Sequence, residues 1–516
     1  MISDSEIHSA ATPVIDEELS GREPSPIQAV LAPGVPLCVD LDGTLVKSDT
    51  LVDSLLALAR QKPGEILRIP SWIAQGKAQF KKHVTGAVTL DVEHLPYNRP
   101  LLEWLRAEHG AGRTIYLTTA ADRSLAQRVA DHLGIFAGVL ASDGTTNLAG
   151  KNKLEAFREH FGERFCYIGN AKPDVAVLCA CVSPMTANPD RALTAGLRRA
   201  GTVPAANFED SSPALKSWLR AVRLHQWAKN VLIFVPLLLA HLWNLPAFCA
   251  AGVAFLSFGL CASATYIIND LLDLEADRKH PRKRKRPFAA GDLSAAAGMA
   301  AVIVLMCASL ALAISLPRIV RSVPGSGTSG SYGFLLWLGI YTVTTLTYSL
   351  YLKRVVLLDV FVLSGLYTVR ILAGAAAAQI GLSPWLAGFS VFFFLSLAFV
   401  KRFSELEGLR ERGGSISTGR GYHVNDLEQL RALGTGSMFA SVVVMTLYIN
   451  NSENKLLYHH MARLWLVVPV LLLWLSQVWM LASRGQMHDD PVVWAITSRR
   501  SLILGLVMAA VVWWAV

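Results

Sequence analysis

The chain has 516 residues, of which 52% are hydrophobic and 17% are charged, and its formal net charge is +9. This composition is too apolar for an ordinary soluble protein, and the length predicts about two to four domains. Much of the positive charge lies in short loops between apolar runs, which is typical of a membrane protein and argues against a nucleic-acid partner.

The N-terminal part differs from the rest of the chain. Residues 1–33 are polar and acidic and lack the apolar core of a signal peptide, so we expect a disordered tail. Residues 34–195 have the pattern of a soluble α/β domain, whereas residues 213–516 consist mostly of apolar runs. The seven cysteines show no regular spacing, which indicates a reducing compartment without a disulfide framework.

A short apolar strand near residue 37 ends in the acidic loop DLDGTL. This arrangement predicts a site at the carboxyl end of a parallel strand in an open α/β sheet. Asp40, Asp42, Gly43 and Thr44 match DxDGT, and through this motif the domain resembles the haloacid dehalogenase superfamily. The resemblance implies that Asp40 is a nucleophile toward phosphorus and that Asp42 acts first as an acid and then as a base.

Two later segments match further motifs of the same superfamily. The sequence TIYLTT is a second strand, and the resemblance implies that Thr119, or alternatively Thr118, holds the phosphoryl group. Lys153 matches the lysine of the third motif, with Lys151 close enough to be an alternative.

The fourth motif concerns the metal. In FCYIGNAKPD, Asp174 would support the ion, but Asn170 stands where a first acidic ligand is common. The resemblance implies a Mg²⁺ site, with Mn²⁺ as an alternative, formed by Asp40, the backbone carbonyl of Asp42, Asn170 and Asp174. Because an amide is a weaker Mg²⁺ ligand than a carboxylate, an inactive domain with a regulatory role stays open.

Three segments connect these motifs to the apolar half. Residues 51–95 are rich in Leu, Ala and Lys and predict a small helical cap that sets substrate choice. Residues 196–212 are rich in small residues and proline and predict a connector. Residues 213–230 mix Trp and Leu with Lys and Arg, which predicts an amphipathic helix in the lipid headgroup region.

Nine apolar runs follow and predict an all-α transmembrane bundle. They cover residues 231–245, 247–268, 295–317, 333–351, 355–379, 384–400, 435–449, 464–482 and 501–516. Lys and Arg gather in the loops on one side of these runs. The positive-inside rule therefore places the soluble domain and the motifs on the cytoplasmic side of a bacterial inner membrane.

Directly after the second run, the sequence NDLLDLEADRKHPRKRKRPFAAG combines ordered carboxylates with a basic tract. Asn269, Asp270, Asp273 and Asp277 are spaced to lie on one helical face. Carboxylates at the mouth of a membrane helix need a positive partner, and Mg²⁺ that holds a diphosphate is the usual one. A charge cluster that only sets topology is the simpler alternative.

This pattern, NDxxDxxxD after the second of nine spans, resembles the first Asp-rich motif of the UbiA superfamily of intramembrane prenyltransferases over residues 213–516. Tyr348 and Lys353 match the tyrosine and lysine that the superfamily has at the cytoplasmic end of the fourth span. Asp359 and Arg370 lie inside the fifth run, where charges are costly in lipid. They either face an interior cavity or form a structural ion pair.

The loop after the sixth run reads KRFSELE instead of a second Asp-rich motif, and Lys and Arg suit phosphate better than metal. Together with RLHQWAKN before the first span, it resembles the decaprenyl-phosphate phosphoribosyltransferase branch. The residues that this resemblance assigns to substrate binding are Arg223, Gln226, Lys229, Asn230, Asn269, Lys283, Arg286, Tyr348, Lys353, Lys401, Arg402, Glu405 and Tyr422.

The resemblance implies a Mg²⁺-dependent transferase whose carboxylates at Asp270, Asp273 and Asp277 bind phosphoribosyl diphosphate and whose acceptor is a polyprenyl phosphate. The soluble domain is then expected to remove the 5-phosphate from the lipid product. The alternative is a prenyltransferase that uses polyprenyl diphosphate and a small aromatic acceptor, beside an inactive or regulatory soluble domain. Contacts with membrane lipids are expected, and a homo-oligomer is possible.

Overall fold

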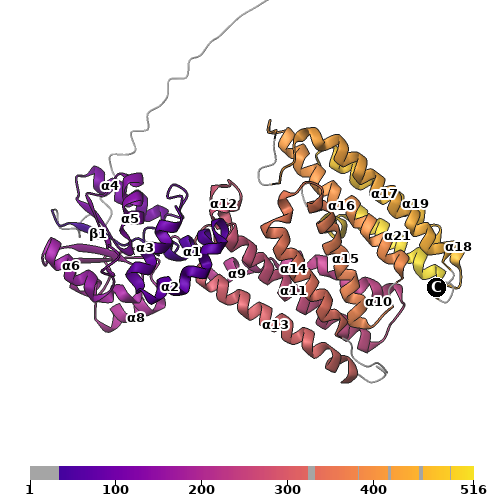
Figure 1. Ribbon diagram of the computed structural model, residues 1–516, viewed down its shortest axis with the longest axis horizontal. Helices are drawn as coiled ribbons and strands as arrows, with labels where there is room; N and C mark the ends of the chain where they lie inside the picture. Colours follow the sequence, from indigo (N-terminus) through magenta and orange to yellow (C-terminus); the bar gives the residue numbers. More distant parts are fainter. Residues whose placement is uncertain (1–33, 323–331, 382, 416–419, 452–456, 488–489) are drawn as a thin grey trace, which may run out of the picture. The chain divides into compact units, whose positions relative to one another are not determined.

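The computed structural model describes residues 34–322, 332–381, 383–415, 420–451, 457–487 and 490–516. The tail expected at residues 1–33 lies outside these ranges. The chain divides into two compact units, Met1–Ser212 and Pro213–Val516, whose elements are labelled in Figure 1.

A six-stranded parallel sheet forms the centre of the first unit, as the sequence predicts. Its strands are β1 (Leu37–Val39), β2 (Ile115–Asp122), β3 (Gly138–Ser142), β4 (Cys166–Gly169), β5 (Ser183–Ala187) and β6 (Ala206–Phe208). They pair in the order β3-β2-β1-β4-β5-β6, so that β1 lies where the strand order reverses. In doubly wound sheets, sites form at the carboxyl ends of the strands beside this reversal.

Helices connect the parallel strands, because each parallel crossover needs a long connection. They are α4 (Arg99–Gly110), α5 (Arg123–Leu133), α6 (Lys151–Phe161), α7 (Val175–Ala180) and α8 (Arg191–Arg199). Leu101 and Leu105 of α4 and Val129 of α5 are buried against the residues of β1 and β2. This burial of the apolar side of each helix fixes the sheet and the loops at its carboxyl edge.

The segment at residues 196–212 differs from the expected connector. Helix α8 continues to Arg199, and β6 pairs with Met185 to Ala187 of β5. The residues that suggest a linker belong to the turn between them, where Gly201 has a φ of +68°. Because β6 completes the sheet edge, the first unit extends beyond residue 195.

The insert between β1 and β2 is helical, and its elements are α1 (Thr50–Gln61), η2 (Pro63–Arg68), α2 (Ile69–Ala74) and α3 (Lys77–Ala87). Asp49 begins α1 as its N-cap by accepting from the N–H groups of Leu51 and Val52. Leu58, Trp72 and Val84 form a small core of their own. The insert is therefore a cap with separate packing.

In the second unit, seven helices of the described residues are long and apolar enough to cross a membrane. They contain α11 (Leu245–Leu272), α13 (Ala295–Ser322), α14 (Gly333–Leu350), α15 (Leu358–Ala378), α16 (Pro384–Arg410), α17 (Leu427–Asn450), which lies in the span Val424–Asn450, and α19 (Val467–Ser483), which α18 extends to the span Met461–Ser483. The shorter elements are α9 (Ala214–Val222), η4 (Leu224–Phe234), α10 (Val235–Leu239), α12 (Leu274–Lys279), η6 (Leu352–Arg354), α18 (Met461–Leu464), α20 (Pro491–Thr497) and α21 (Arg499–Ala515). The chain is a multi-pass membrane protein.

The nine predicted spans thus become seven in the described part of the chain. The run at residues 231–245 contains the last residues of the 3₁₀ segment η4, followed by α10, which is only five residues long. The run at residues 501–516 belongs to α21, whose 17 residues are at the short limit for a span. An apolar run shows that a segment avoids water, but it does not show that the segment is one straight helix.

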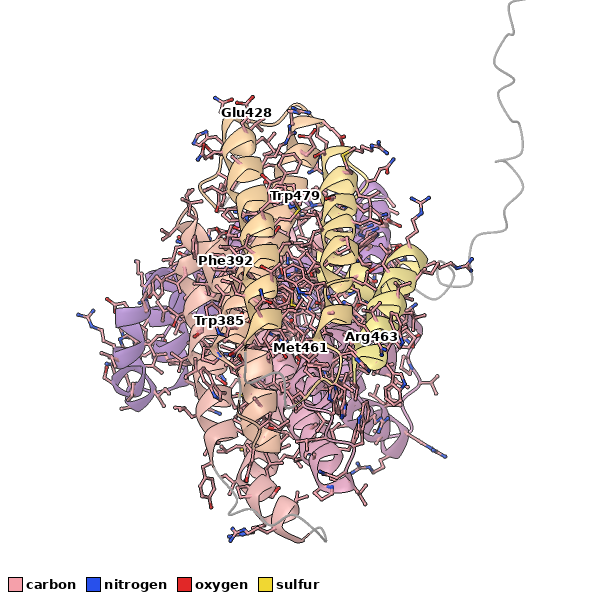
Figure 2. The ribbon with its side chains drawn as sticks, turned by 90° about the vertical axis from the view of Figure 1, so that its right-hand side faces the viewer. Trp385, Phe392, Glu428, Met461, Arg463 and Trp479 are labelled. Carbon is pink, nitrogen blue, oxygen red and sulfur yellow. The ribbon has the colours of Figure 1, made fainter. Side chains whose placement is uncertain are left out.

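Glycines allow the long helices to pack closely against neighbouring segments. A Cβ at Gly374 of α15 would lie 2.0 Å from the backbone oxygen of Ile233, and a Cβ at Gly434 of α17 would lie 2.2 Å from the ring of Trp479. The Trp479 Nε1–H also donates to Ser396 Oγ at 3.1 Å. Figure 2 shows Trp479 among these helices, whereas Trp385 of α16 is 41% exposed, as is expected of a side chain that faces lipid.

Candidate functional sites

The first site lies at the carboxyl end of β1, where Asp40 directly follows the strand. Lys153, near the start of α6, donates from Nζ to Asp40 Oδ1 at 2.7 Å. Both side chains are buried, whereas Lys151 is exposed. The structure therefore brings Lys153, and not Lys151, to the predicted aspartate.

Tyr167 extends this contact to Asp174. The Tyr167 hydroxyl, on β4, accepts from Lys153 Nζ at 2.8 Å and donates to Asp174 Oδ1 at 2.7 Å. Asp174 Oδ2 accepts from the N–H groups of Asn170 and Ala171 at 3.2 and 3.1 Å. These hydrogen bonds fix the buried carboxylate of Asp174. Sequence reasoning missed Tyr167, although a hydroxyl within an apolar strand is a signal that could have found it.

Asn170 lies across the loop from Gly43. Gly43 has a φ of +76°, and a Cβ there would lie 2.0 Å from Asn170 Nδ2. Glycine is needed both for this backbone conformation and for the close approach. The Asp42 side chain is held by the first residue of α1, because its Oδ1 accepts from the Thr50 N–H at 2.8 Å.

The two carboxyl groups of the DxDGT motif have raised pKa values. Burial raises the pKa of Asp40 to about 6, against the opposing charge of Lys153. Burial and then the charge of Asp49 raise the pKa of Asp42 to about 7. Carboxyl groups that titrate near neutral pH are suited to proton transfer.

Thr118 and Thr119 lie in the middle of β2, and both are buried. Thr118 Oγ1 donates to the backbone oxygen of Val39 at 3.3 Å and so ties β2 to β1. Thr119 Oγ1 accepts from the Ala121 N–H at 3.0 Å. Because Thr118 is used between the strands, Thr119 is the better candidate for a phosphoryl contact.

The first site fits a divalent cation. Lys153 Nζ lies 2.7 Å from Asp40 Oδ1 and 3.8 Å from Asp174 Oδ1, so that one ammonium serves two buried carboxylates. The remaining negative charge calls for a further cation. The oxygens of Asp40, Asp174 and Asn170, with the Asp42 backbone carbonyl, are the hard ligands that Mg²⁺ prefers.

The second site begins at the end of α11. Asp270 lies in the last turn of α11, Asp273 follows that helix as its C-cap, and Asp277 lies in α12. The expected single helical face is thus interrupted at Asp273, where φ is −92° and ψ is 9°. Arg286 connects the two parts, because its Nη1 lies 3.0 Å from Asp270 Oδ1 and 2.6 Å from Asp277 Oδ2.

Two more cations reach these carboxylates from distant segments. Arg223 Nη2 donates to Asp270 Oδ1 at 2.5 Å, and Lys353 Nζ donates to Asp273 Oδ2 at 2.9 Å. Arg223 has a left-handed backbone, with a φ of 54°, at the bend between α9 and η4. The segments that carry Arg223, Lys353 and the carboxylates after α11 therefore meet at this second site.

A cavity of about 560 Å³ opens beside Asp270. Its lining consists of Leu215, Lys216, Leu219, Arg220, Arg223, His225, Asp270, Arg286 and Pro287. Four Lys or Arg side chains against one carboxylate make the cavity positive, which suits a polyanionic ligand.

A second cluster of charges gathers around Asp490, which sequence reasoning missed. Asp490 Oδ2 accepts from Lys229 Nζ at 2.8 Å and from Lys401 Nζ at 2.9 Å, and Oδ1 accepts from the Tyr367 hydroxyl at 3.0 Å. Although burial by itself would raise the pKa of Asp490, the charges of Lys401 and Lys229 hold this pKa well below its usual range. An aspartate before proline is an ordinary N-cap signal, so nothing near residue 490 indicates these partners.

Lys229 and Lys401 are predicted to face a substrate phosphate, but in the structure both bind Asp490. The cavity beside Lys401 and Asp490 measures only about 10 Å³. A phosphate does not fit there while Asp490 holds both lysines.

Arg402 and Tyr422 also make internal contacts. Arg402 Nη2 lies 2.5 Å from Asp359 Oδ2, and the Tyr422 hydroxyl donates to Asp359 Oδ1 at 2.5 Å and accepts from the Leu357 N–H at 2.8 Å. Asp359 thus pairs with Arg402, and not with Arg370 as considered from the sequence. These contacts join the start of α15 to α16 and to the loop that follows α16.

The other predicted residues lie outside the lining of the large cavity. Arg370 donates from Nε to Asn230 Oδ1 at 3.0 Å and lies 4.9 Å from the ring centre of Tyr341. Gln226, Asn269 and Tyr348 are half-buried, Lys283 is exposed, and Glu405 accepts from Arg420 at 2.8 Å.

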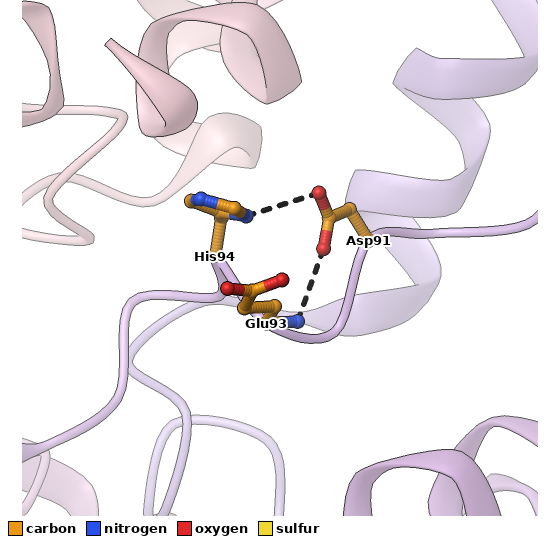
Figure 3. A group of neighbouring side chains, drawn as sticks. All are labelled: Asp91, Glu93 and His94. Atoms are coloured by element: carbon orange, nitrogen blue, oxygen red, sulfur yellow. Dashed lines mark hydrogen bonds and ion pairs between the residues drawn. The ribbon is translucent and has the colours of Figure 1, made fainter. Parts of the chain in front are cut away.

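Figure 3 shows Asp91, Glu93 and His94, the one group of three His, Cys, Asp or Glu ligand atoms within 4.8 Å in the described ranges. Asp91 Oδ1 accepts from the Glu93 N–H at 3.1 Å, and Asp91 Oδ2 lies 3.0 Å from His94 Nδ1. These bonds close a local turn, which accounts for the group without a metal.

Residues 231–503 match the UbiA prenyltransferase family. The uncharacterized protein y4nM of Sinorhizobium fredii is 38% identical over 480 residues, which cover 92% of this chain and 90% of that protein. This alignment is long enough to include both units. The nodulation protein NoeC of Azorhizobium caulinodans is 33% identical over 309 residues, which cover 57% of this chain and 92% of that protein.

Decaprenyl-phosphate phosphoribosyltransferase of Mycobacterium tuberculosis is 34% identical over 202 residues. The match covers 38% of this chain and 62% of that protein, which is less than two thirds of its length. Among solved structures, a UbiA homolog from Archaeoglobus fulgidus bound to GPP and Mg²⁺ has a TM-score of 0.42 and 16% identity over 58% of this chain and 99% of that chain.

Proposed function

The chain belongs to the UbiA prenyltransferase family, and we propose that its second unit transfers 5-phosphoribose from phosphoribosyl diphosphate to a polyprenyl phosphate. The observation that carries this proposal is the cavity of about 560 Å³, where Arg223 and Arg286 meet at Asp270. A ligand with a diphosphate and a further phosphate matches its excess of positive charge. The similarity to decaprenyl-phosphate phosphoribosyltransferase supports the same substrate class.

Asn269, Asp270, Asp273 and Asp277 would hold Mg²⁺, which neutralises charge on a departing diphosphate when it is bound. Their oxygen donors fit this ion, and Asp270 and Asp277 already share one cation, Arg286.

Arg223 and Arg286 are placed to bind diphosphate oxygens and to stabilise the charge that develops as the bond to the ribose C1 breaks. Lys353 positions Asp273 through its hydrogen bond. The acceptor phosphate attacks C1 as an anion and needs no general base, because it is already ionised at neutral pH.

We infer that the first unit then removes the 5-phosphate from the lipid product, as its resemblance to the haloacid dehalogenase superfamily suggests. Asp40 attacks phosphorus, and Asp42 gives a proton to the leaving oxygen and later takes one from water. Lys153 holds Asp40 in place, and Thr119 contacts the phosphoryl oxygens. Asp40, the Asp42 carbonyl, Asn170 and Asp174 would hold a Mg²⁺ that neutralises phosphoryl charge.

Both reactions are proposed for the cytoplasmic side of the inner membrane. The support is the concentration of Lys and Arg in the loops on one side of the spans, which include the tract at residues 278–286.

One experiment tests the transfer step. Purified protein is incubated with Mg²⁺, polyprenyl phosphate and radiolabelled phosphoribosyl diphosphate, and lipid-extractable label is followed. We expect labelled lipid with the wild type and none with Asp270→Asn. Absence of labelled lipid, under conditions where polyprenyl diphosphate and 4-hydroxybenzoate react, would refute the phosphoribosyl transfer and favour an ordinary prenyltransferase.

The second step has its own test. An Asp40→Asn variant should accumulate the 5-phosphorylated lipid, whereas the wild type should release phosphate from it. Identical lipid products from the two proteins would show that the first unit has a regulatory role only.

A further inference from the structure

We propose that the cavity under the cap of the first unit contains an anion subsite centred on Lys81, which selects phosphate esters whose leaving group carries a second negative charge. This inference rests on the phosphatase function proposed above and specifies its substrate class.

The cavity lies where the cap meets the carboxyl ends of β1 and β2. It measures about 60 Å³, and Asp42, Thr50, Lys81 and Asp122 are among its lining residues. Lys81 belongs to the cap helix α3, whereas Asp42 follows β1. Because Asp42 is the proposed proton donor to the leaving oxygen, the leaving group must lie on this side of the site.

Lys81 brings a positive charge into this space without a carboxylate in its hydrogen bonds. Its Nζ donates to the Ala120 backbone oxygen at 2.6 Å and to Asn147 Oδ1 at 3.0 Å, and both partners are neutral. An ammonium has three N–H donors, so these bonds leave one for a ligand. The carboxylates of Asp42, Asp49 and Asp122 line the same cavity and offset part of the cost of burying the ammonium, but none of them occupies its two hydrogen bonds.

The surrounding carboxylates have other tasks. Asp49 and Asp122 are the N-caps of α1 and α5, and Asp42 accepts from the Thr50 N–H at 2.8 Å. These bonds to the backbone keep the three carboxylates in place when a ligand enters. An anionic leaving group is therefore repelled by fixed negative charge unless Lys81 compensates it.

The contacts of Lys81 also place the subsite close to the reacting groups. Ala120 directly follows Thr119, and Asn147 precedes the helix that carries Lys153. An ester of ribose 5-phosphate that bears a second phosphate at C1 has the required pair of charges. A ribose 5-phosphate with a neutral C1 substituent lacks the second one.

Two soluble probes separate these cases in the full-length protein. Ribose 1,5-bisphosphate carries the second charge, and methyl riboside 5-phosphate does not; removal of the 5-phosphate from each is measured. We expect Lys81→Met to lower kcat/KM for the bisphosphate by about tenfold to a hundredfold, which is the usual effect of a lost hydrogen bond to a charged group. For the methyl riboside we expect a change below about twofold, because no charged contact is lost.

Two further variants guard against a general defect. Lys81→Arg keeps the charge and should keep the preference for the bisphosphate. Lys77→Met, an exposed lysine at the start of the same helix, should behave as the wild type with both probes. An equal loss of both activities in Lys81→Met, with transferase activity retained, would overturn the subsite and leave Lys81 as a structural link. Hydrolysis of neither probe by the wild type would instead overturn the phosphatase function, and the subsite with it.

Discussion

Asp40 and Asp174 share the single ammonium of Lys153, whereas Asp270 receives two guanidinium groups, from Arg223 and Arg286. The first arrangement leaves a net negative charge. In the second, Arg286 also pairs with Asp277, so the two guanidinium groups balance two carboxylates, and the excess positive charge comes from Lys216 and Arg220 in the cavity lining. At the residue scale, the charges of the first site favour a cation and those lining the second favour a polyanion, which agrees with the ligands proposed for each.

The hydroxyl of Tyr167 connects Lys153 to Asp174, so its loss should disturb the first site alone. We expect Tyr167→Phe to lower kcat for the proposed phosphatase reaction by roughly 5- to 30-fold, which corresponds to about 1–2 kcal/mol for a hydrogen-bonded pair. Steady-state kinetics with a soluble phosphate ester measure the effect. The control is Tyr116→Phe, a half-buried tyrosine on β2, and an equal loss there would contradict the role of Tyr167.

Asp490 holds Lys229 and Lys401 together, and its removal leaves two facing ammonium groups. We expect Asp490→Ala to destabilise the protein by about 3–5 kcal/mol, as is usual when one member of a buried ion pair is removed. The pKa of Asp490 lies below its unfolded value of 3.8, so its contribution is present above that pH and is lost only as the pH falls through the folded pKa. Thermal unfolding in detergent should show the same difference from the wild type at pH 5 and pH 7.

A second substitution provides the control for Asp490. Asp490→Ala combined with Lys401→Met removes one of the two opposed charges and should recover part of the lost stability. A double variant that is less stable than the single one would contradict the proposed ion-pair role.

The sequence was informative for residues within compact motifs and uninformative for contacts between distant segments. Asp40, Lys153 and Asp174 could be predicted because each lies in a short recognisable pattern. Asp490 could not, since its partner Lys229 is 261 residues away and only tertiary packing brings the two together.

At the scale of elements, the close approach of α15 to η4 depends on Gly374. A Cβ there meets the backbone oxygen of Ile233, which cannot move as a side chain can. We expect Gly374→Ala to destabilise the second unit by about 1–3 kcal/mol, as overpacking usually does. The matched control is Gly365→Ala in the same helix, where a Cβ meets nothing within 4 Å. Equal thermal stability of the two variants would contradict the close packing.

Hydrophobicity predicted the long helices, but it failed where an apolar segment has another backbone form. Seven predicted runs correspond to long helices, whereas the run at residues 231–245 contains 3₁₀ structure and a short helix. Likewise, the spacing of Asp270, Asp273 and Asp277 is helical, but the backbone at Asp273 ends α11. Composition reports burial, and it carries little information on where a helix stops.

At the scale of the whole molecule, one chain carries two sites in separate units, and we expect their chemistry to be separable. Asp270→Asn should abolish lipid labelling while hydrolysis of a soluble 5-phosphate ester continues. Asp40→Asn should do the reverse, because its carboxylate belongs to the other unit. Loss of both activities in either variant would contradict independent sites.

The covalent connection between the two units should reduce the release of intermediate if both reactions occur. A product held on the same chain meets the second site at a high effective concentration, so little intermediate should escape. Mixing an Asp40→Asn protein with an Asp270→Asn protein should therefore release more 5-phosphorylated lipid than the wild type does, as measured by lipid extraction during turnover.

Strand β6 has a practical consequence for work on the first unit. A fragment cut near residue 195 would lack the strand that pairs with Met185 to Ala187 and would expose the backbone donors and acceptors of β5. Unpaired edges of this kind recruit strands from other molecules. Such a fragment should aggregate, whereas one that extends to Ser212 keeps β5 paired with β6 and should stay monodisperse.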